Sequence, residues 1–292
     1  MTRIALAADS YDWHARALTA AFASLGATVV RLHLDACLFA TGHATGLDLP
    51  GFADALPDAV LVREMSGGSF EQVTRRLGVL HALSALGVAV WNDALAIERC
   101  VDKSMTSFLL ARAGVPTPDT WTVEGIARAR AVLAAPGGAL VLKPLFGAQG
   151  KGLRRVAAAD ELPEPASVAG VYYLQRLIAP AGEGFRDHRV FVCGGEVLAA
   201  MTRRGASWIT NIKQGGTPEP LRPDREMAEL ALRAATAVGA GYAGVDLLRD
   251  CDGRLWVLEV NSMPAWRGLQ RVTDVNVALR IAAAVLAAAN AR

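Results

Sequence analysis

The stretch of sequence that decides the fold lies near the end of the chain and reads Gly244-Val245-Asp246-Leu247-Leu248-Arg249-Asp250-Cys251-Asp252-Gly253-Arg254-Leu255-Trp256-Val257-Leu258-Glu259-Val260-Asn261. Two apolar runs flank Asp252-Gly253, the dipeptide that best fits a two-residue type I′ turn, because both central residues of that turn need a positive φ. Such a turn predicts a β-hairpin in which Cys251 faces Arg254. The same register puts Asp246 opposite Glu259.

Asp246 and Glu259 carry the chemistry of this predicted hairpin. Side chains alternate between the two faces of a strand, so Asn261 shares the face of Glu259, and directly opposed Cβ atoms are roughly 4.5 to 5.5 Å apart. The other residues of both strands are largely apolar, and two carboxylates among them would repel each other unless a cation joined them. Two carboxylates and a neutral amide suit Mg²⁺. The alternative is a plain hairpin with its charges at a solvated end.

The size and composition of the chain indicate an ordinary globular protein. With 292 residues it is long enough for two or three lobes with cores of their own. Hydrophobic residues make up 52% and charged residues 20%, which excludes a disordered chain. The net charge of +2 comes without a basic run or an aromatic-interleaved basic stripe, so we expect no nucleic-acid partner.

The four cysteines, Cys37, Cys100, Cys193 and Cys251, show no paired metal-ligand spacing, and the N-terminus enters a predicted strand without a signal peptide. These features predict a reduced, cytoplasmic protein. The most apolar segment, residues 277–290, is interrupted by Arg280 and falls short of a membrane span. We therefore expect a packed terminal helix and no membrane partner.

The first ninety residues predict a small parallel α/β lobe. Strand patterns cover residues 4–8, 28–34, 59–63 and 88–91, and helical periodicity covers residues 13–25 and 70–86, each ended by a glycine. Strands that alternate with helices are typical of βαβ units. No G-x-G-x-x-G follows the first strand, so a dinucleotide site is not supported.

Residues 92–111 predict a turn and a helix that carries Lys103, and a lobe boundary is expected at residues 114–118, before a glycine-rich segment. The strand at residues 139–143 runs into residues 144–152, which hold three glycines together with Lys151, and Lys143 stands just before them. Bare amides and ammonium groups in such a flap can cover phosphates. It is not a Walker A loop, because Gly152 follows Lys151. By itself the segment can equally be a simple hairpin turn.

The remaining segments predict a second group of strands. A strand pattern covers residues 171–178, and a hairpin is expected from residues 187–191 and 196–202 around a turn at 193–195. Arg203 and Arg204 close that hairpin and Asn211 follows it; arginine pairs of this kind are usually solvated. A helix is expected from residue 224 to about residue 238, before Gly239.

Taken in order, these motifs resemble the ATP-grasp superfamily, and most closely its RimK-like amino-acid ligases. They are a Lys before a flap (K-P-x-x-G-x-x-G from residue 143), a hinge-like strand, an Arg/Asn segment, and the G-V-D and L-E-V-N strands of the hairpin. The resemblance covers residues 92–268 and is weaker in the first lobe. It implies an α/β ATP-grasp fold with an N-terminal lobe over residues 1–92, a central lobe over 93–176 and a C-terminal lobe over 177–292.

In that family ATP lies between the central and C-terminal lobes, so the resemblance implies a nucleotide site here. The residues implied for ATP are Lys103, Lys143, Gly147, Gln149, Gly150, Gln175, Arg176, Leu177, Asp187, Arg203 and Asn211. Lys143 and Arg203 are the implied catalytic residues. Asp246, Glu259 and Asn261 are implied to hold two Mg²⁺ ions, which Mn²⁺ can replace.

The sequence departs from the family pattern at two points. Arg176 stands in the adenine strand where the family commonly has Glu, so we expect only backbone contacts there. After E-V-N, residues 264–268 read P-A-W-R-G where P-G-L-E-G is frequent. We therefore expect Trp266 and Arg267 to contact the acceptor substrate; the alternative is that Trp266 packs against the C-terminal helix and Arg267 is solvated.

The family reaction implied by the resemblance is ligation. A carboxylate attacks the γ-phosphate of ATP to give an acyl phosphate, and an amine then displaces phosphate to form an amide. We expect the amino acid to be L-glutamate and the acceptor to be a small carboxylate, such as a pterin- or furan-type one-carbon cofactor precursor. Transfer to a protein or peptide C-terminus is the alternative acceptor, and a homo-oligomer is compatible with this assignment.

Two readings from other classes remain. The chain can be a nucleotide-binding module that regulates a partner without catalysis, but a pure binder has no need of the carboxylates and amide at residues 246, 259 and 261. A flavin or nicotinamide enzyme would need a fingerprint that the sequence lacks. ADP release in the presence of candidate substrates separates the enzyme from the module.

Overall fold

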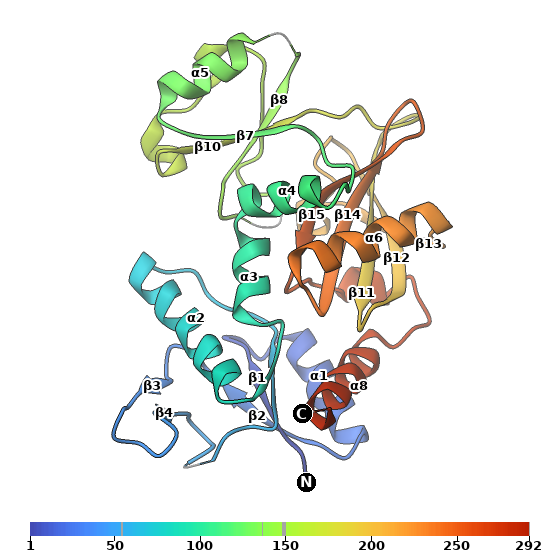
Figure 1. The fold of residues 1–292 in the computed structure, drawn as a ribbon. Helices are drawn as coiled ribbons and strands as arrows, with labels where there is room; N and C mark the ends of the chain where they lie inside the picture. Colours follow the sequence, from blue (N-terminus) through green and yellow to red (C-terminus); the bar gives the residue numbers. More distant parts are fainter. Residues whose placement is uncertain (54, 136, 148–149, 292) are drawn as a thin grey trace.

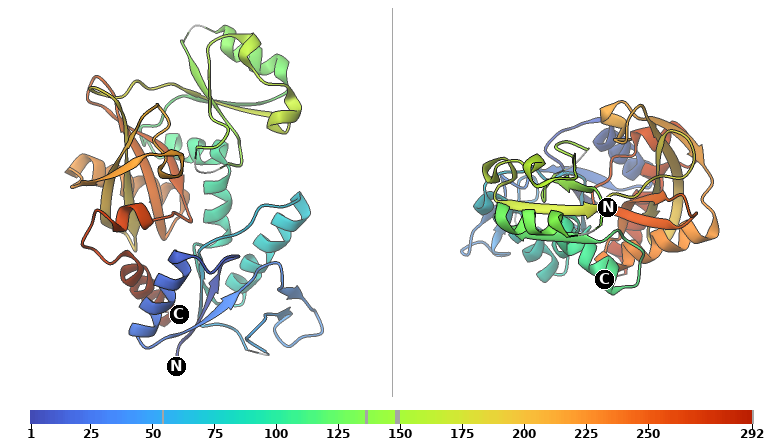
Figure 2. Two further views of the ribbon diagram at one scale, coloured as in Figure 1. Left: turned by 180° about the vertical axis from the view of Figure 1, so that it is seen from behind. Right: turned by 90° about the horizontal axis from the view of Figure 1, so that it is seen from above.

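The structure, a computed structural model, describes residues 1–53, 55–135, 137–147 and 150–291, and shows an α/β chain in three lobes (Figure 1). In that view the first lobe lies at the bottom, the central lobe at the top, and the third lobe to the right between them. Seen from behind, in the left panel of Figure 2, the central and third lobes stand side by side above the first. The expected α/β class is confirmed.

A four-stranded parallel sheet forms the first lobe, in the order β2-β1-β5-β6. Its capped helices begin where side chains satisfy free backbone N–H groups: Asp12 accepts from Ala15, and Ser69 and Gln72 form a capping box. A short hairpin that we did not expect, β3 with β4, follows β2. The elements are β1 (Arg3–Ala7), α1 (Trp13–Ser24), β2 (Thr28–Leu32), β3 (Leu38–Phe39), β4 (Leu47–Asp48), β5 (Ala59–Val62), α2 (Phe70–Ala85) and β6 (Ala89–Trp91).

The single helix expected over residues 92–111 is wrong, because Asp102 divides it in two. α3 (Ala94–Val101) ends and α4 (Lys103–Arg112) begins at this residue, whose backbone is extended. The Asp102 carboxylate accepts from the backbone N–H groups of Ser104 and Met105, so it caps the second helix and does not continue the first. The break places Lys103 in the first turn of α4.

The central lobe is an antiparallel sheet in the order β7-β10-β8-β9, with α5 on one side (Figure 1). The sequence predicted β8 and β10 but not β7, α5 or β9. Buried side chains of α5, β8, β9 and β10, with Leu162, make a small core that belongs to this lobe alone. The elements are β7 (Thr120–Glu124), α5 (Ile126–Ala134), β8 (Leu140–Lys143), β9 (Arg154–Val156), the 3₁₀ turns at Ala159–Glu161 and Pro165–Val168, and β10 (Val171–Arg176).

The third lobe is a five-stranded antiparallel sheet in the order β13-β12-β11-β14-β15, one face of which packs on α6. The helix begins at Asp224, whose side chain caps it, and ends at Gly239 with a positive φ, as expected. The elements are β11 (Phe185–Cys193), β12 (Glu196–Gly205), a 3₁₀ turn at Ile212–Gln214, β13 (Thr217–Leu221), α6 (Arg225–Val238), β14 (Tyr242–Arg249), β15 (Leu255–Asn261), α7 (Arg267–Gln270) and α8 (Val277–Asn290).

The first and third lobes share one hydrophobic core. Helix α8 returns to the first lobe and packs against α1, where Figure 2 shows the two helices side by side. Leu18 of α1, Phe191 of β11 and Ile281 of α8 belong to the same cluster of buried residues. The expectation that residues 277–290 form a packed terminal helix is confirmed.

Asn92 ties these two lobes together through its side chain. Its Nδ2 donates to the backbone oxygens of Tyr242 and Ser262, at 2.7 and 2.6 Å, and its Oδ1 accepts from the N–H groups of Gly241 and Tyr242. Asn92 is buried, and every polar atom of its amide has a partner. This residue therefore fixes the first lobe against strand β14 and the end of β15.

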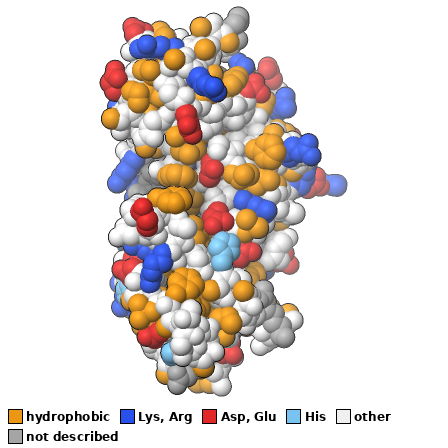
Figure 3. Space-filling model, turned by 60° about the vertical axis from the view of Figure 1, so that its left-hand side comes forward, with side chains coloured by type: hydrophobic (Ala, Val, Ile, Leu, Met, Phe, Trp, Pro, Cys, Tyr) orange, Lys and Arg blue, Asp and Glu red, His pale blue; other side chains and the backbone are white. Residues whose placement is uncertain are grey.

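The surface and the cysteines agree with a globular chain. On the described part of the face in Figure 3, Lys and Arg side chains alternate with Asp and Glu, and no basic stripe runs across it. All four cysteines are free, and burial raises the pKa of Cys37 to about 11 and that of Cys100 and Cys193 to about 12. Within the described ranges, none of the helices has the length and apolarity needed to span a membrane.

Candidate active site

The β14–β15 hairpin places Asp246 opposite Glu259, as expected, although its turn differs from the expected one. Residues 251–253 form a three-residue loop, in which Gly253 has a φ of +83° and donates to Asp250 O. The outer half of the hairpin is therefore shifted by one residue from the expected register, with Arg249 opposite Leu255. A bulge next to Asp246 restores the expected pairing at the inner end, where Gly244 faces Asn261.

Asp246 lies in a cluster of arginines. Arg189 is its partner across β11 and β14 and donates twice to its carboxylate, at 2.7 Å each, and Arg203 contacts it at 2.9 Å. Burial would raise the pKa of Asp246, but the two guanidinium groups outweigh it, so the pKa lies below its ordinary value. The carboxylate is therefore ionised and ready to bind a cation.

Arg203 joins Asp246 to Asp187, its partner across the β11–β12 hairpin. The Arg203 guanidinium donates to Asp187 from Nε at 2.7 Å and also from Nη2. Burial would lower the pKa of Arg203, but Asp246 and Asp187 outweigh it and raise the pKa above its ordinary value. These residues form a continuous charged network from Arg189 to Asp187 along the sheet.

Two lysines face this network from the central side of the molecule. Lys143 ends strand β8 and Lys103 begins α4, and both are buried. Burial lowers the pKa of each lysine, against the opposing effect of Glu259. An anionic group bound between them would restore their full charge, so the pair is suited to a phosphate.

The glycine flap contacts Lys103 of α4 and lies close to Asn211 of the third lobe. Lys103 Nζ donates to the backbone oxygens of Leu145 and Gly147, at 3.2 and 2.7 Å. Gly150 has a φ of +72°, and a Cβ atom there would come within 2.4 Å of Asn211 Oδ1. Glycine is therefore required at 150 both by its backbone conformation and by the close approach of the third lobe. Gln149, expected in this flap, lies outside the described residues.

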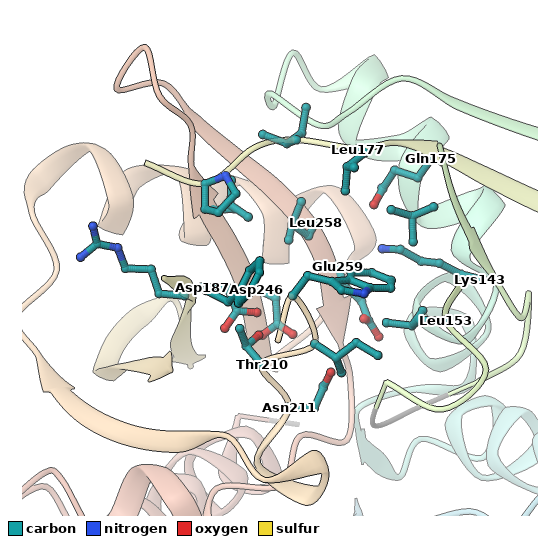
Figure 4. A pocket seen from close by; sticks show the side chains of 18 of the residues that line it. Lys143, Leu153, Gln175, Leu177, Asp187, Thr210, Asn211, Asp246, Leu258 and Glu259 are labelled. Atoms are coloured by element: carbon teal, nitrogen blue, oxygen red, sulfur yellow. The ribbon is translucent and has the colours of Figure 1, made fainter. Parts of the chain in front are cut away.

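A cavity between the central and third lobes brings most of the expected residues together (Figure 4). It contains about 900 Å³ of empty space, part of which is open to solvent. One end is apolar, with Val141 and Leu177 on one side and Leu248 and Leu258 on the other. The charged or polar lining includes six further expected residues, which are Lys143, Asp187, Arg203, Asn211, Asp246 and Glu259.

Not every expected residue lines this cavity with its side chain. Gln175 is buried and lines it, but Arg176 extends its guanidinium to Asp119 and to Gly137 O. The expectation of backbone contacts only at Arg176 is thus consistent with where its side chain lies. Lys103, Gly147, Gly150 and Asn261 are not among the lining residues.

Trp266 and Arg267 lie away from this cavity, at the junction of the first and third lobes. Trp266 is fully buried, and its ring packs edge-on against His14 and Phe191. Its indole is therefore a core side chain and offers no open surface to a substrate ring, which corrects our expectation for this residue. Arg267 is exposed, with its guanidinium 6.0 Å from the ring of Trp13.

Sequence reasoning missed three side chains of the site. Arg189 was overlooked because its partner, Asp246, lies on a strand 57 residues away. Arg155 of β9 and Trp208 both line the cavity, with the guanidinium 5.7 Å from the indole ring. The sequence signals for these two residues were a pair of arginines in β9 and a tryptophan in the loop after β12.

The donor groups fit a magnesium ion. Asp246 and Glu259 face each other across the hairpin, and Asn261 donates from Nδ2 to Gly244 O at 3.2 Å, which leaves its Oδ1 free to bind a ligand. Within the described ranges no group of three or more His, Cys, Asp and Glu side chains forms a metal site. Two carboxylates with an amide, and other positions left for phosphate oxygens and water, is the arrangement that Mg²⁺ prefers.

The chain was compared with known proteins. The RimK-like ATP-grasp domain family matches residues 100–285. The tetrahydromethanopterin:alpha-L-glutamate ligase of Methanosarcina acetivorans is 32% identical over 95% of this chain and 97% of its own length. The ligase of the same name from Methanococcus maripaludis is 41% identical over 65% of this chain and 67% of its own. Among solved structures, the ATP-grasp ligase PsnB complexed with minimal precursor has a TM-score of 0.75 at 22% identity, covering 99% of both chains, which shows the fold alone.

Proposed function

Because the chain belongs to the RimK-like ATP-grasp family, we propose that it is an ATP-dependent ligase that joins L-glutamate to a carboxylate of a pterin-type cofactor precursor. The observation that carries the proposal is the pairing of Asp246 with Glu259 at the charged end of a cavity that Lys143 enters from the other lobe. The two relatives named for ligation of glutamate to tetrahydromethanopterin support the choice of substrates.

The proposed reaction has two steps. A carboxylate oxygen of the acceptor attacks the γ-phosphorus of ATP, and ADP leaves, so that an acyl phosphate forms. The amino group of L-glutamate then attacks the acyl carbon, loses a proton, and displaces inorganic phosphate to give the amide. The protein contributes by aligning the groups and by neutralising charge on the transferring phosphoryl oxygens.

The side chains of the cavity have roles that follow from their charge. We assign Lys143 and Lys103 to the phosphates, because both are buried cations without a carboxylate in ion-pair contact among the described residues. Arg203 and Asn211 are assigned to the terminal phosphate. The apolar end takes the adenine ring between Leu177 and Leu258, with the backbone of Arg176 at its edge and Asp187 near the ribose.

Asp246, Glu259 and Asn261 are the proposed ligands of two magnesium ions, which Mn²⁺ can replace. When bound, magnesium neutralises charge on the phosphate oxygens. Arg189 and Arg203 both contact the Asp246 carboxylate, and N–H groups of theirs that do not contact it would hold a phosphoryl oxygen or the attacking carboxylate. The flap, which contains Gly147, Gln149 and Gly150, would close over the phosphates and keep water from the acyl phosphate. The proposal includes cytoplasmic location and leaves room for a homo-oligomer.

The proposal is tested by supplying the protein with Mg-ATP, L-glutamate and tetrahydromethanopterin. We expect ADP release that depends on both substrates, together with a product heavier than the acceptor by one glutamyl residue in mass spectrometry. Omission of glutamate is the matched control. If ADP is released only when a protein or peptide acceptor replaces the pterin, the alternative acceptor is correct. If no substrate set releases ADP although ATP binds, the chain is a binding module.

A further inference from the structure

The strand order of the first-lobe sheet has a switch point that lies outside the nucleotide cavity. The strand order β2-β1-β5-β6 changes direction between β1 and β5, because the chain moves to opposite sides of β1 when it adds β2 and β5. In open parallel sheets such a switch point leaves a crevice beyond the carboxyl ends of the strands, where ligands bind. The residues at these ends are Ala8 to Ser10 after β1 and Arg63 to Met65 after β5.

The strand ends at this switch point face the loop that follows the predicted metal ligand Asn261. Arg63 Nη1 donates to Met263 O at 3.2 Å, and Met263 lies two residues after Asn261. A chain advances by at most about 3.6 Å per residue, so this guanidinium lies close to the end of β15. Further along the loop, His14 Nε2 accepts from the backbone N–H groups of Trp266 and Arg267, at 3.2 Å each. The first lobe thus holds the loop that carries Arg267.

Two arginines lie at this junction, and the Asp12 carboxylate interacts electrostatically with Arg63 without an ion-pair contact. The Arg63 guanidinium lies 5.4 Å from the Trp266 ring, and that of Arg267 lies 6.0 Å from the Trp13 ring. Neither has a carboxylate within ion-pair distance among the described residues. Arg63 Nε is also buried without a hydrogen-bond partner there, which leaves donors of this guanidinium unused. After burial, both arginines contribute to the lowered pKa of the intervening His14.

The carboxylates at the same edge are already occupied. Glu64 accepts from Ser10 at 2.9 Å, Asp9 accepts from Ser66 at 2.6 Å, and Asp12 is paired with His14 at 2.7 Å. Among the described residues, none of these acids is hydrogen-bonded to Arg63 or Arg267. Guanidinium groups outside ion pairs, near aromatic rings and at a switch point, are suited to bind an oxyanion bidentately.

We propose that Arg63 and Arg267 form a binding subsite for a carboxylate of the acceptor other than the one that is activated. The acceptor is then at least a dicarboxylate, held at one end by these arginines while its other carboxylate reaches the terminal phosphate of ATP. This inference rests on the proposed ligase function for its kinetic consequence. It adds Arg63 to the acceptor site and replaces the role that we expected for Trp266.

The subsite can be tested without turnover through the indoles beneath the arginines. Protein labelled with ¹⁵N-tryptophan is titrated with glutarate and, separately, with its monoamide, and the indole signals of Trp13 and Trp266 are followed by NMR. We expect glutarate to shift them at concentrations roughly tenfold lower than the monoamide, the scale of one lost charge-assisted hydrogen bond. Equal responses to the two probes, or a response to inorganic phosphate but not to glutarate, would overturn the assignment.

The kinetic test uses Arg267→Ala and Arg63→Ala with tetrahydromethanopterin as the acceptor. Each change should raise the KM for the acceptor roughly ten- to a hundredfold and leave the KM for ATP unchanged. Arg267→Ala is the cleaner variant, because its side chain makes no hydrogen bond to the described residues. Arg63→Lys keeps the charge but not the bidentate geometry, and should recover only part of the loss.

Arg3→Ala is the matched control, because Arg3 is stacked on Phe52 at 4.7 Å but at the opposite, amino end of β1. It should leave the acceptor KM unchanged. An unaltered acceptor KM in both Arg267→Ala and Arg63→Ala, in a protein that makes product, would refute the subsite alone. If the wild type makes no product, the proposed function fails, and the glutarate titration still decides whether the subsite exists.

Discussion

The central lobe and the rest of the molecule differ in how they are held. The first and third lobes share one core, in which α1, β11 and α8 contribute side chains to the same cluster, and Asn92 bonds across their boundary. The central lobe has a small core of its own. The predicted metal ligands and both arginines of the charged network belong to the joined lobes, whereas Lys143 and the flap belong to the central one. We infer that the side of the site built by the first and third lobes is rigid, whereas the side built by the central lobe can move relative to it.

Among the variants considered, we expect the largest loss of activity from Glu259→Gln, which changes a predicted metal ligand of the joined lobes and leaves their core intact. Glu259→Gln should lower turnover below detection, because a lost metal ligand removes several kcal/mol of transition-state stabilisation. Glu259 is not fully buried, and its neighbours on β15 keep their packing, so the unfolding midpoint should change little. ADP release and urea unfolding measure the two outcomes. Near-normal ADP release by the folded variant would remove Glu259 from the metal site.

Substitutions in the two hydrophobic cores test whether the central lobe unfolds separately from the other two lobes. Trp266→Ala should destabilise the first and third lobes together by about 3 to 5 kcal/mol, whereas Leu174→Ala should destabilise the central lobe by about 2 to 5 kcal/mol. Hydrogen exchange in low denaturant, read peptide by peptide, locates each loss. We expect faster exchange in both α1 and β14 for the first variant, and in β8 and β10 only for the second. Uniform acceleration in both variants would show a single cooperative unit.

The glycine flap of the central lobe is expected to become ordered when nucleotide binds. Backbone amides at Gly147 and Gly150 to Gly152 should exchange more slowly when Mg-ATP is bound, because a ligand that orders a segment protects it. Gly150→Ala should weaken ATP binding, since its methyl group would meet Asn211 and the residue would keep an unfavourable positive φ. Gly87→Ala is a control with the same sign of φ and open space around it. Unchanged flap exchange at saturating nucleotide argues against a phosphate lid.

We expect the smallest effect on stability from His14, which lies at the boundary between the first and third lobes. Burial, and then Arg63, lower the pKa of His14, so below pH about 6.5 the unfolded chain binds a proton that the folded one resists. Stability should therefore fall as the pH drops below that value, by at most about 1.4 kcal/mol per pH unit for one proton. Urea unfolding at several pH values should show a shallower acid loss for His14→Gln than for the wild type. His188, whose pKa burial also lowers, is present in both proteins and cancels. Parallel pH profiles for the two proteins would exclude His14.

The β14–β15 hairpin shows what the sequence could predict and what it could not. The pairing of Asp246 with Glu259 is confirmed, yet it follows from two compensating features, a loop one residue longer than expected and a bulge at the inner end. In β11 and β12 a similar bulge after Phe191 brings Asp187 opposite Arg203, whereas an unbroken register from the turn would pair it with Thr202. Bulges depend on contacts with neighbouring strands, so the local sequence does not announce them.

Long-range pairing limited the candidate site in the same way. The pairing of Asp246 with Glu259 could be predicted because they lie on one hairpin, where the local pattern limits the register. Arg189 faces Asp246 only because β11 and β14 are neighbours in the sheet, and nothing in the sequence around either strand reports that order. Trp266 was misassigned because a tryptophan after a functional strand looks like a ligand contact, while its burial depends on α1 from the other end of the chain.

The packing of α8 on α1 has a consequence for how the protein is made. The first lobe leaves the ribosome early, but Leu18 and Phe22 of α1 share their core with Ile281 and Val285, which are synthesised roughly 190 residues after β6. At about 5 to 20 residues per second that delay lasts about 10 to 40 s. During this time an apolar face of the nascent first lobe stays uncovered. The native core of this lobe can close only after α8 has been synthesised, so chaperones that shield nascent chains have a long opportunity to act on α1.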